Sequence, residues 1–126
     1  MFQEPAPVVP ASAIVAGDFN FMPAHPEYPL VCGTPSKYGR LATAEHLSDA
    51  WIAAGNSEEG VDSFPREGRT DHVFVTHDLA ARVKAARIGY GIKASDHWPV
   101  FVGFDLWIRR RTASWRHQLS RRMRPF

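Results

Sequence analysis

The sequence predicts an α/β protein, in the mixed α+β sense that strands and short helices alternate along the chain. Three observations carry this prediction: short apolar or alternating runs that suit strands, runs of helix formers between them, and breaks rich in proline or glycine. The chain has 126 residues, 44% of them hydrophobic and 22% charged, which fits one globular domain. Its single cysteine excludes an internal disulfide.

The first predicted elements lie in the N-terminal half. Residues 13–16 (AIVA) are wholly apolar and are followed by Gly17, which predicts a strand buried on both faces. Three prolines within residues 23–29 predict a loop. Residues 41–54 (LATAEHLSDAWIAA) are rich in helix formers and end before Gly55, which predicts a helix.

The C-terminal half continues the alternation. Residues 71–76 (DHVFVT) alternate in polarity, which predicts a strand. Residues 79–86 are predicted to form a short helix. In residues 100–106 (VFVGFDL) every second side chain is apolar and shares one face, so a second clear strand is expected there.

Charge is distributed unevenly along the chain. Residues 107–126 contain seven of the 15 basic side chains and no acid, so residues 1–106 carry a formal charge of −5. Residues 107–123 place apolar side chains on one side of a possible helix. This pattern suits an anionic membrane or nucleic acid, but we favour a solvated helix that packs on the body or on a missing piece of it. The N-terminus lacks the pattern of a signal peptide, and no apolar run is long enough to span a membrane. The compartment therefore stays unknown, with the cytoplasm as the default.

Polar residues follow or precede the predicted strands at three places. Asp18 and Asn20 come after the first strand, Asp71 begins the second, and Asp96 and His97 precede Pro99 at the start of the last. A carboxylate there suits a hard cation such as Mg²⁺. An imidazole held by a second carboxylate, for which Asp71 is the candidate, stays protonated and can bind a phosphate oxygen. Taken alone, residues 17–20 are as easily a turn, and Asp71 and the Asp96–His97 pair are better explained as exposed strand-start and loop residues.

Together these motifs resemble the C-terminal half of the endonuclease/exonuclease/phosphatase superfamily, over residues 11–106. The similarity rests on four segments, "IVAGDFN", "LSDAW", "SFPREGRTDHVFV" and "SDHWPVFV". Pancreatic-type deoxyribonucleases, apurinic/apyrimidinic endonucleases and bacterial sphingomyelinases belong to this superfamily. The resemblance implies half of a four-layer α/β/β/α sandwich, with a mainly antiparallel or mixed sheet and helices on one face.

The resemblance also implies roles for individual residues. Asp18 would orient or deprotonate the attacking water, and Asn20 would hold a phosphate oxygen. Asp96 would bind the metal, expected to be Mg²⁺ with Mn²⁺ as an alternative. His97, paired with Asp71, would contact the scissile phosphate. The catalytic set is thus Asp18, Asn20, Asp71 and His97, and Asn20 and His97 also bind a phosphate-ester substrate, either nucleic acid or a phospholipid head group.

The chain departs from the family pattern in two ways. His72 stands where the family usually has a tyrosine, and we predict that it is a packing residue. The family's N-terminal half carries the principal glutamate metal ligand, and Glu4 lies too close to Asp18 to serve as that ligand. We therefore expect a lead-in at residues 1–10, the half-domain at residues 11–106 and a basic amphipathic tail at residues 107–126.

The predicted function is thus the C-terminal part of a Mg²⁺-dependent phosphoesterase. Three origins stay open: a fragment that starts at an internal methionine, one half of a two-chain enzyme, or a catalytically incomplete half-domain kept as an interaction module. The partner is accordingly a missing N-terminal half or a second chain. In all three cases an apolar sheet face is expected to be exposed, and the chain alone is expected to be inactive or incomplete.

Overall fold

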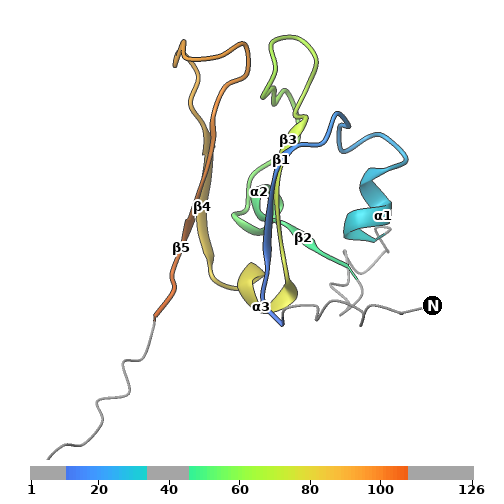
Figure 1. Cartoon of the computed structure of the whole chain (residues 1–126), viewed down its shortest axis with the longest axis vertical. Coiled ribbons are helices and arrows are strands. Elements are labelled where there is room, and N and C mark those ends of the chain that lie inside the picture. The colour runs from blue at the N-terminus through green and yellow to red at the C-terminus, as the bar shows by residue number, and fades with distance from the viewer. Residues whose placement is uncertain (1–10, 34–45, 108–126) are drawn as a thin grey trace, which may run out of the picture.

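The computed structural model describes residues 11–33 and 46–107, which form five strands and three short helices (Figure 1). Among these residues no helix has the length and apolar character that a membrane crossing needs. The predicted lead-in at residues 1–10 and almost all of the predicted tail lie outside the described residues. The elements are β1 (Ile14–Asp18), α1 (Tyr28–Cys32), β2 (Ser48–Asp49), α2 (Ala50–Ala53), β3 (Asp71–Val75), α3 (His77–Ala80), β4 (Val83–Ile88) and β5 (Val100–Phe104).

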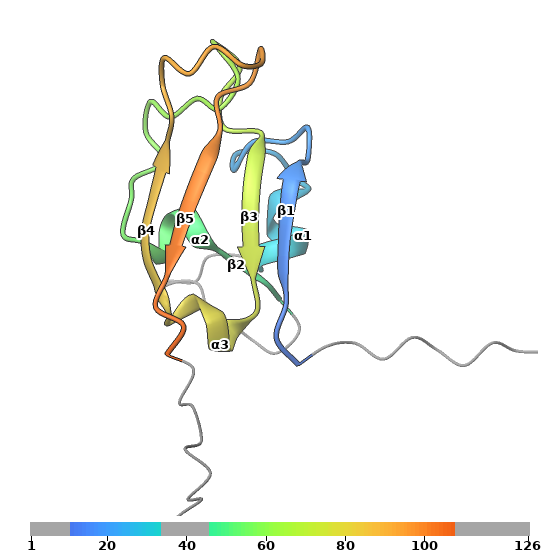
Figure 2. The same ribbon diagram turned by 60° about the vertical axis from the view of Figure 1, so that its left-hand side comes forward.

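The strands form two antiparallel sheets, one with the order β1-β3-β2 and one made by the β4–β5 hairpin. Strand β5 contacts β3, so the two sheets make one layer, and α1 and α2 lie behind that layer (Figure 2). This arrangement confirms the predicted α/β class, with antiparallel pairing and helices on one face. The face turned away from α1 and α2 is called the open face below, and the face that packs on them is called the closed face.

The core lies between the strand layer and the helices on the closed face. In one cluster, Tyr28 and Cys32 of α1 pack with Phe74 of β3, and Phe19 and Phe21 pack around them. A second cluster joins α2 to β3 and β4 through Ala50, Val75 and Val83. Burial of one large side chain such as Phe74 contributes about 1.5–3 kcal/mol. These clusters hold α1 and α2 against the sheet and leave the opposite face uncovered within the described residues.

Strand β1 forms as predicted, but the expectation that it is buried on both faces was wrong. All five of its residues are exposed, with Ile14 at 48% and Val15 at 42%. The physical reason is its position at the edge of the sheet, where β3 is its only paired neighbour and no described element packs on the open face. Ile14 lies on the same face of β1 as Ala16, whereas Val15 points to the opposite face. The expected exposed apolar sheet face stays a prediction.

Two predicted helices need correction. Residues 79–86 do not form a helix, because α3 ends at Ala80 and Val83–Ile88 pair with β5 instead. Of the predicted helix at residues 41–54, the described part contains the two-residue strand β2 and then only the short helix α2. The predicted loop at residues 23–29 runs into helix α1, which the proline pattern did not indicate. Strands β3 and β5 begin at Asp71 and Val100, as predicted.

Candidate functional site

Three of the predicted site residues, Asp18, Asp71 and His97, meet at one end of the open face. Antiparallel pairing of β1 with β3 places the last residue of β1, Asp18, directly opposite the first residue of β3, Asp71. The loop before β5 brings His97 to the same end of the layer (Figure 2). Asp96 and His97 are not subject to the side-chain alternation of a strand, because regular pairing of β5 starts only at Val100.

Asp71 and His97 form a direct pair. The Nδ1 atom of His97 lies 2.8 Å from Oδ2 of Asp71, within hydrogen-bond distance. The hydrogen bond to Asp71 raises the pKa of His97, and the charges of Asp71, Asp18 and Asp96 add to this effect, against a smaller opposing effect of burial. The other ring nitrogen, Nε2, lies 3.9 Å from Oδ2 of Asp18. The imidazole is thus held between two carboxylates, with Nε2 free to donate to a third group.

A buried serine fixes the Asp71 side of this pair. Ser63 is fully buried, and its hydroxyl donates to Oδ2 of Asp71 at 2.6 Å. The same hydroxyl oxygen accepts from the backbone N–H groups of Thr70 (3.0 Å) and Asp71 (2.9 Å). The carbonyl of Ser63 also accepts from the N–H of Trp98, so this residue ties the start of β3 to the loop that carries His97. Sequence reasoning missed Ser63 because nothing local distinguishes a buried loop serine eight residues before Asp71.

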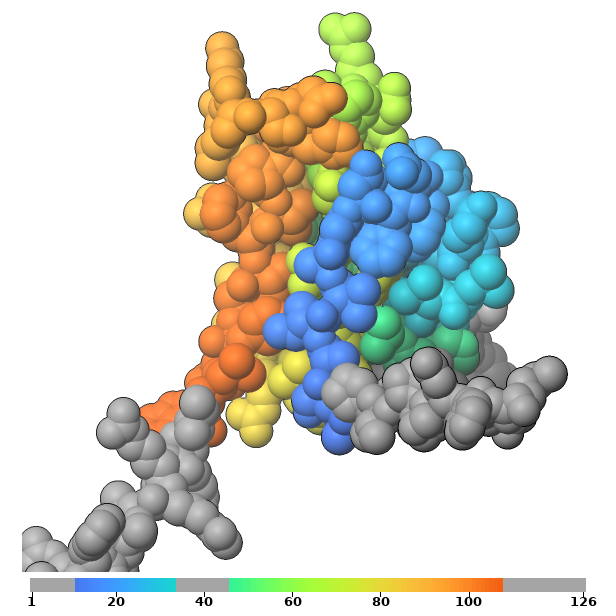
Figure 3. Space-filling model, in the orientation of Figure 1, coloured from blue at the N-terminus to red at the C-terminus, as the bar shows by residue number. Residues whose placement is uncertain are grey.

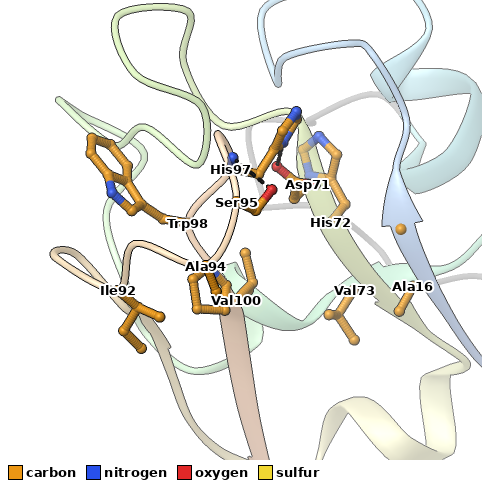
Figure 4. Close-up of a pocket in the computed structure, with 12 residues that line it drawn as sticks. Ala16, Asp71, His72, Val73, Ile92, Ala94, Ser95, His97, Trp98 and Val100 are labelled. Atoms are coloured by element: carbon orange, nitrogen blue, oxygen red, sulfur yellow. Dashed lines mark hydrogen bonds and ion pairs between the residues drawn. The ribbon is translucent and has the colours of Figure 1, made fainter.

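A cavity of about 330 Å³ opens on the open face beside the pair. Apolar side chains of Ala16, Val73 and Val100 line it, and Asp71 and His97 lie at its upper rim (Figure 4). Such a mostly apolar hollow with a few convergent polar groups is the usual form of a small-molecule site.

The segment after β1 places Asp18 and Asn20 differently from a plain extended chain. Asp18 Oδ1 accepts from the backbone N–H of Asn20 at 2.9 Å, and Asn20 has a φ of 55°, in the left-handed region. Phe19 turns into the core, where its ring lies 5.0 Å from that of Phe74. Both polar side chains stay exposed at the same end as His97.

The metal-binding capacity of the site depends on which carboxylates are free. One oxygen or nitrogen atom each of Asp18, Asp71 and His97 lie within 4.8 Å of one another. However, Asp71 Oδ2 already accepts from Ser63 and from His97, which leaves Asp18 as the more available ligand of this group. Asp96 is exposed and accepts only from the Ser95 hydroxyl, at 3.1 Å, among the described contacts. Mg²⁺ typically binds one or two carboxylates and keeps several waters, so Asp18 is a candidate ligand in this group.

The neighbouring residue on β3, His72, belongs to the closed face. It is 1% exposed, its Nδ1 accepts from Arg69 at 2.9 Å, and its Nε2 donates to the Phe21 carbonyl at 2.8 Å. Its ring stacks on Phe74 with a centroid distance of 5.1 Å. These contacts support the predicted packing role of His72.

Arg69 and Asp49 form the centre of this closed-face network. Arg69 Nη2 lies 2.6 Å from Asp49 Oδ2, and both side chains are 2% exposed. The Tyr28 hydroxyl donates to the same carboxylate at 2.7 Å. Burial by itself would raise the pKa of Asp49, but the contacts with His72, Arg69 and Tyr28 outweigh it and lower the pKa to about 2. His72 Nδ1 is 3.8 Å from Asp49, beyond hydrogen-bond distance, so the direct partner of the carboxylate is Arg69.

Comparison with known proteins places the chain in a family. Residues 3–97 match the sequence pattern of the Endonuclease/Exonuclease/phosphatase family. The chain therefore belongs to this family, whose members are hydrolases that act on phosphate esters. Neither the curated proteins nor the solved structures gave a match.

Proposed function

We propose that this chain carries one half of a metal-dependent phosphoesterase site, at which water attacks a phosphate ester. One observation carries the proposal: His97 is held by Asp71 through Nδ1, while its Nε2 lies 3.9 Å from Oδ2 of Asp18 at the rim of the open face. A protonated imidazole in this position can donate from Nε2 to a phosphate oxygen and stabilise the negative charge that develops on it.

Asp18 and Asn20 take the complementary roles. The 3.9 Å gap between His97 Nε2 and Asp18 Oδ2 is too long for a good hydrogen bond, but one oxygen atom can lie about 2.8 Å from both. That oxygen fits the attacking water, which can donate to Asp18 and accept from His97. Asp18 orients the water or accepts its proton, and the exposed amide of Asn20 holds a non-bridging oxygen.

The metal is proposed to be Mg²⁺, with Mn²⁺ as an alternative. Asp96 would hold it, with Asp18 as the second available carboxylate, because these two side chains are free of ion pairs with Lys or Arg among the described residues. A divalent cation at this position supplies positive charge to the phosphoryl oxygens. Two carboxylates leave most of the coordination sphere to water, substrate or a further protein ligand.

The open face supports the proposal that a second structural unit completes the site. Ile14 and Ala16 of β1 are exposed, and Ala16 lines the cavity on this face. An N-terminal half-domain or a second chain that covered this face would bury them and could contribute the remaining metal ligand. The same exposed face favours the second candidate function, an interaction module that keeps the fold without catalysis. The substrate is proposed to be a phosphate ester of nucleic acid or of a phospholipid head group.

The test uses the intact protein as its gene encodes it, supplied with Mg²⁺ and bis(p-nitrophenyl) phosphate. We expect His97→Ala to lower the hydrolysis rate by about 10²–10³-fold, the loss typical for removal of one donor to a developing oxyanion. Asp18→Ala should lower it at least as much. His77→Ala is the matched control, because His77 is an exposed histidine on α3, outside the site. If the intact protein hydrolyses no phosphate ester, the interaction module becomes the better explanation.

A further inference from the structure

The turn beside His97 holds an arginine in an unusual backbone conformation. Arg66 has a φ of 65°, and Asn20 is the only other non-glycine residue with a positive φ in the described parts of the chain. Left-handed backbone at an ordinary L-residue costs free energy and is found preferentially at functional sites. Asn20 already belongs to the candidate site, which makes the second such residue at the same end of the molecule informative.

The turn is well defined. The Glu67 N–H donates to the Phe64 carbonyl at 3.1 Å, with Pro65 and Arg66 at the two central positions. Proline followed by a residue with positive φ is the pattern of a type II turn, in which glycine is the usual third residue. Arginine in place of glycine therefore opposes the backbone preference of the turn.

The turn also contacts His97 of the Asp71–His97 pair and the loop that carries it. The Phe64 ring lies 4.7 Å from the His97 ring, and the Trp98 N–H donates to the Ser63 carbonyl at 2.8 Å. The Ser63 and Phe64 N–H groups both donate to the Gly68 carbonyl, which closes the base of the turn. Figure 3 shows the green segment that contains this turn and the orange tip of the β4–β5 hairpin projecting from the same end of the molecule.

The charge at the tip of this turn has no partner of opposite sign. Arg66 is exposed, and it makes no ion pair with a carboxylate among the described residues, although Glu67 is its neighbour. A guanidinium is the side chain best suited to bidentate binding of phosphate. It is held on a short, anchored turn whose base contacts the histidine proposed to bind the scissile phosphate.

We propose that Arg66 binds a second phosphate group of the substrate, adjacent to the one that His97 contacts. This inference rests on the proposed function of the Asp71–His97 pair. It narrows the substrate to one that carries at least two phosphates within reach of each other. A polynucleotide and a multiply phosphorylated head group share this chemistry.

The experiment measures binding to the full chain without turnover, by following the His97 imidazole signals in NMR titrations. The probes are thymidine 5′-monophosphate and thymidine 3′,5′-bisphosphate, with inositol 1,4-bisphosphate as the head-group arm. We expect the wild-type chain to prefer a bisphosphate, and Arg66→Gly to reduce that affinity about tenfold while the monophosphate affinity stays unchanged. Because glycine suits the turn, the variant should melt at the same or a higher temperature than the wild type.

Arg82→Gly is the control, since Arg82 is exposed and lies just before β4, at the end opposite the hairpin tip. It removes the same charge and should leave the preference for the bisphosphate intact. A preference confined to the nucleotide or to the inositol arm identifies the source of the second phosphate. The inference is overturned if the wild type shows no preference for either bisphosphate, or if Arg66→Gly keeps that preference. His97→Ala tests the proposed function separately: followed by the ³¹P signal of thymidine 5′-monophosphate, because the imidazole signal is lost, it should show weakened monophosphate binding.

Discussion

Two histidines at the same end of the molecule show how differently one residue type is used on the two faces of the sheet. His72 is 1% exposed on the closed face, with both ring nitrogens engaged by Arg69 and by a backbone carbonyl. The His97 side chain is 30% exposed on the open face, with one nitrogen engaged by Asp71 and the other without a hydrogen bond to any described residue. The first contributes to the core, and the second is available to a ligand.

The adjacent residues Asp71 and His72 show the same difference between the two faces within one strand, β3. Alternation along β3 directs Asp71 to the open face and His72 to the closed face. Each face has its own buried support, Ser63 behind Asp71 and Arg69 beside His72. Substitutions on the closed face should therefore change the free energy of unfolding. Substitutions on the open face should change the pKa of His97 and the binding of phosphate. The following experiments test that rule, from the largest expected effect to the smallest.

The largest effect is expected for Arg69→Met on the closed face. Removal of the guanidinium leaves the 2%-exposed carboxylate of Asp49 without its cation. Loss of one partner of a buried ion pair typically costs about 3–5 kcal/mol. Urea denaturation should show the free energy of unfolding reduced by that amount, which is a large share of the about 5–15 kcal/mol of an ordinary domain.

The control for this change is Arg82→Met, which removes an exposed arginine and should alter stability by less than about 0.5 kcal/mol. The double variant Arg69→Met with Asp49→Asn should lose much less stability than the two single effects added together, because no unpaired charge then remains. If Arg69→Met unfolds at the wild-type urea concentration, the closed-face network is not what stabilises this side of the sheet.

An intermediate effect is expected for Ser63→Ala, because Ser63 is fully buried and supports Asp71 of the open-face pair. The change leaves two backbone N–H groups, those of Thr70 and Asp71, without their acceptor, and it frees the Asp71 carboxylate from a 2.6 Å hydrogen bond. The unfolding free energy should fall by about 1–3 kcal/mol. NMR titration should also show a lowered pKa of His97, because Asp71 is no longer held toward it.

Ser63→Thr retains the hydroxyl and should restore the His97 pKa. Ser57→Ala is the matched control, since the Ser57 hydroxyl also accepts from a backbone N–H but lies on an exposed loop outside the site. A Ser63→Ala chain that loses stability but keeps the wild-type pKa of His97 would show that this serine supports the loop alone.

The predictability of the fold followed the strength of local patterns. Strands β3 and β5 alternate clearly, and both begin at the predicted residues. Residues 83–88 (VKAARI) contain helix formers such as alanine, lysine and arginine, yet pairing with β5 and burial of Val83 and Ile88 impose a strand. Local propensity could not indicate this, because the partner strand lies more than ten residues further along the chain. The burial of β1 was misjudged for a similar reason, since an edge position depends on which strands are its neighbours.

The site was predictable to the extent that its residues lie at strand ends. Asp18, Asp71 and His97 do lie together, and their catalytic roles remain proposals. Asp96 is outside that three-residue group, so its role as metal ligand also remains a proposal. Asp49 carries a local signal that was not used, because its side chain caps α2 by accepting from the Trp51 N–H. Its pairing with Arg69, twenty residues away, left no such signal in the sequence.

The smallest expected effect is a change of pH dependence in Asp71→Asn. The pKa of His97 in the folded chain is raised above its ordinary value of about 6.5, mainly by the hydrogen bond to Asp71. The pair therefore stabilises the folded state fully below pH about 6.5, and this contribution is lost as the pH rises through the raised pKa. Phosphate binding that needs the imidazolium should weaken over the same range. In Asp71→Asn, the NMR titration midpoint of His97 should fall toward the ordinary value, and phosphate binding should weaken at a lower pH.

Asp78→Asn provides the comparison for this last change, because Asp78 is an exposed carboxylate at the start of α3 whose pKa is lowered by hydrogen bonds from Ser12 and Thr76. Its removal takes away one negative charge without touching His97, so the His97 midpoint should stay where it is. Equal shifts in the two variants would mean that His97 responds to the overall charge of the chain. In that case the division between a structural and a chemical face would not extend to the Asp71–His97 pair.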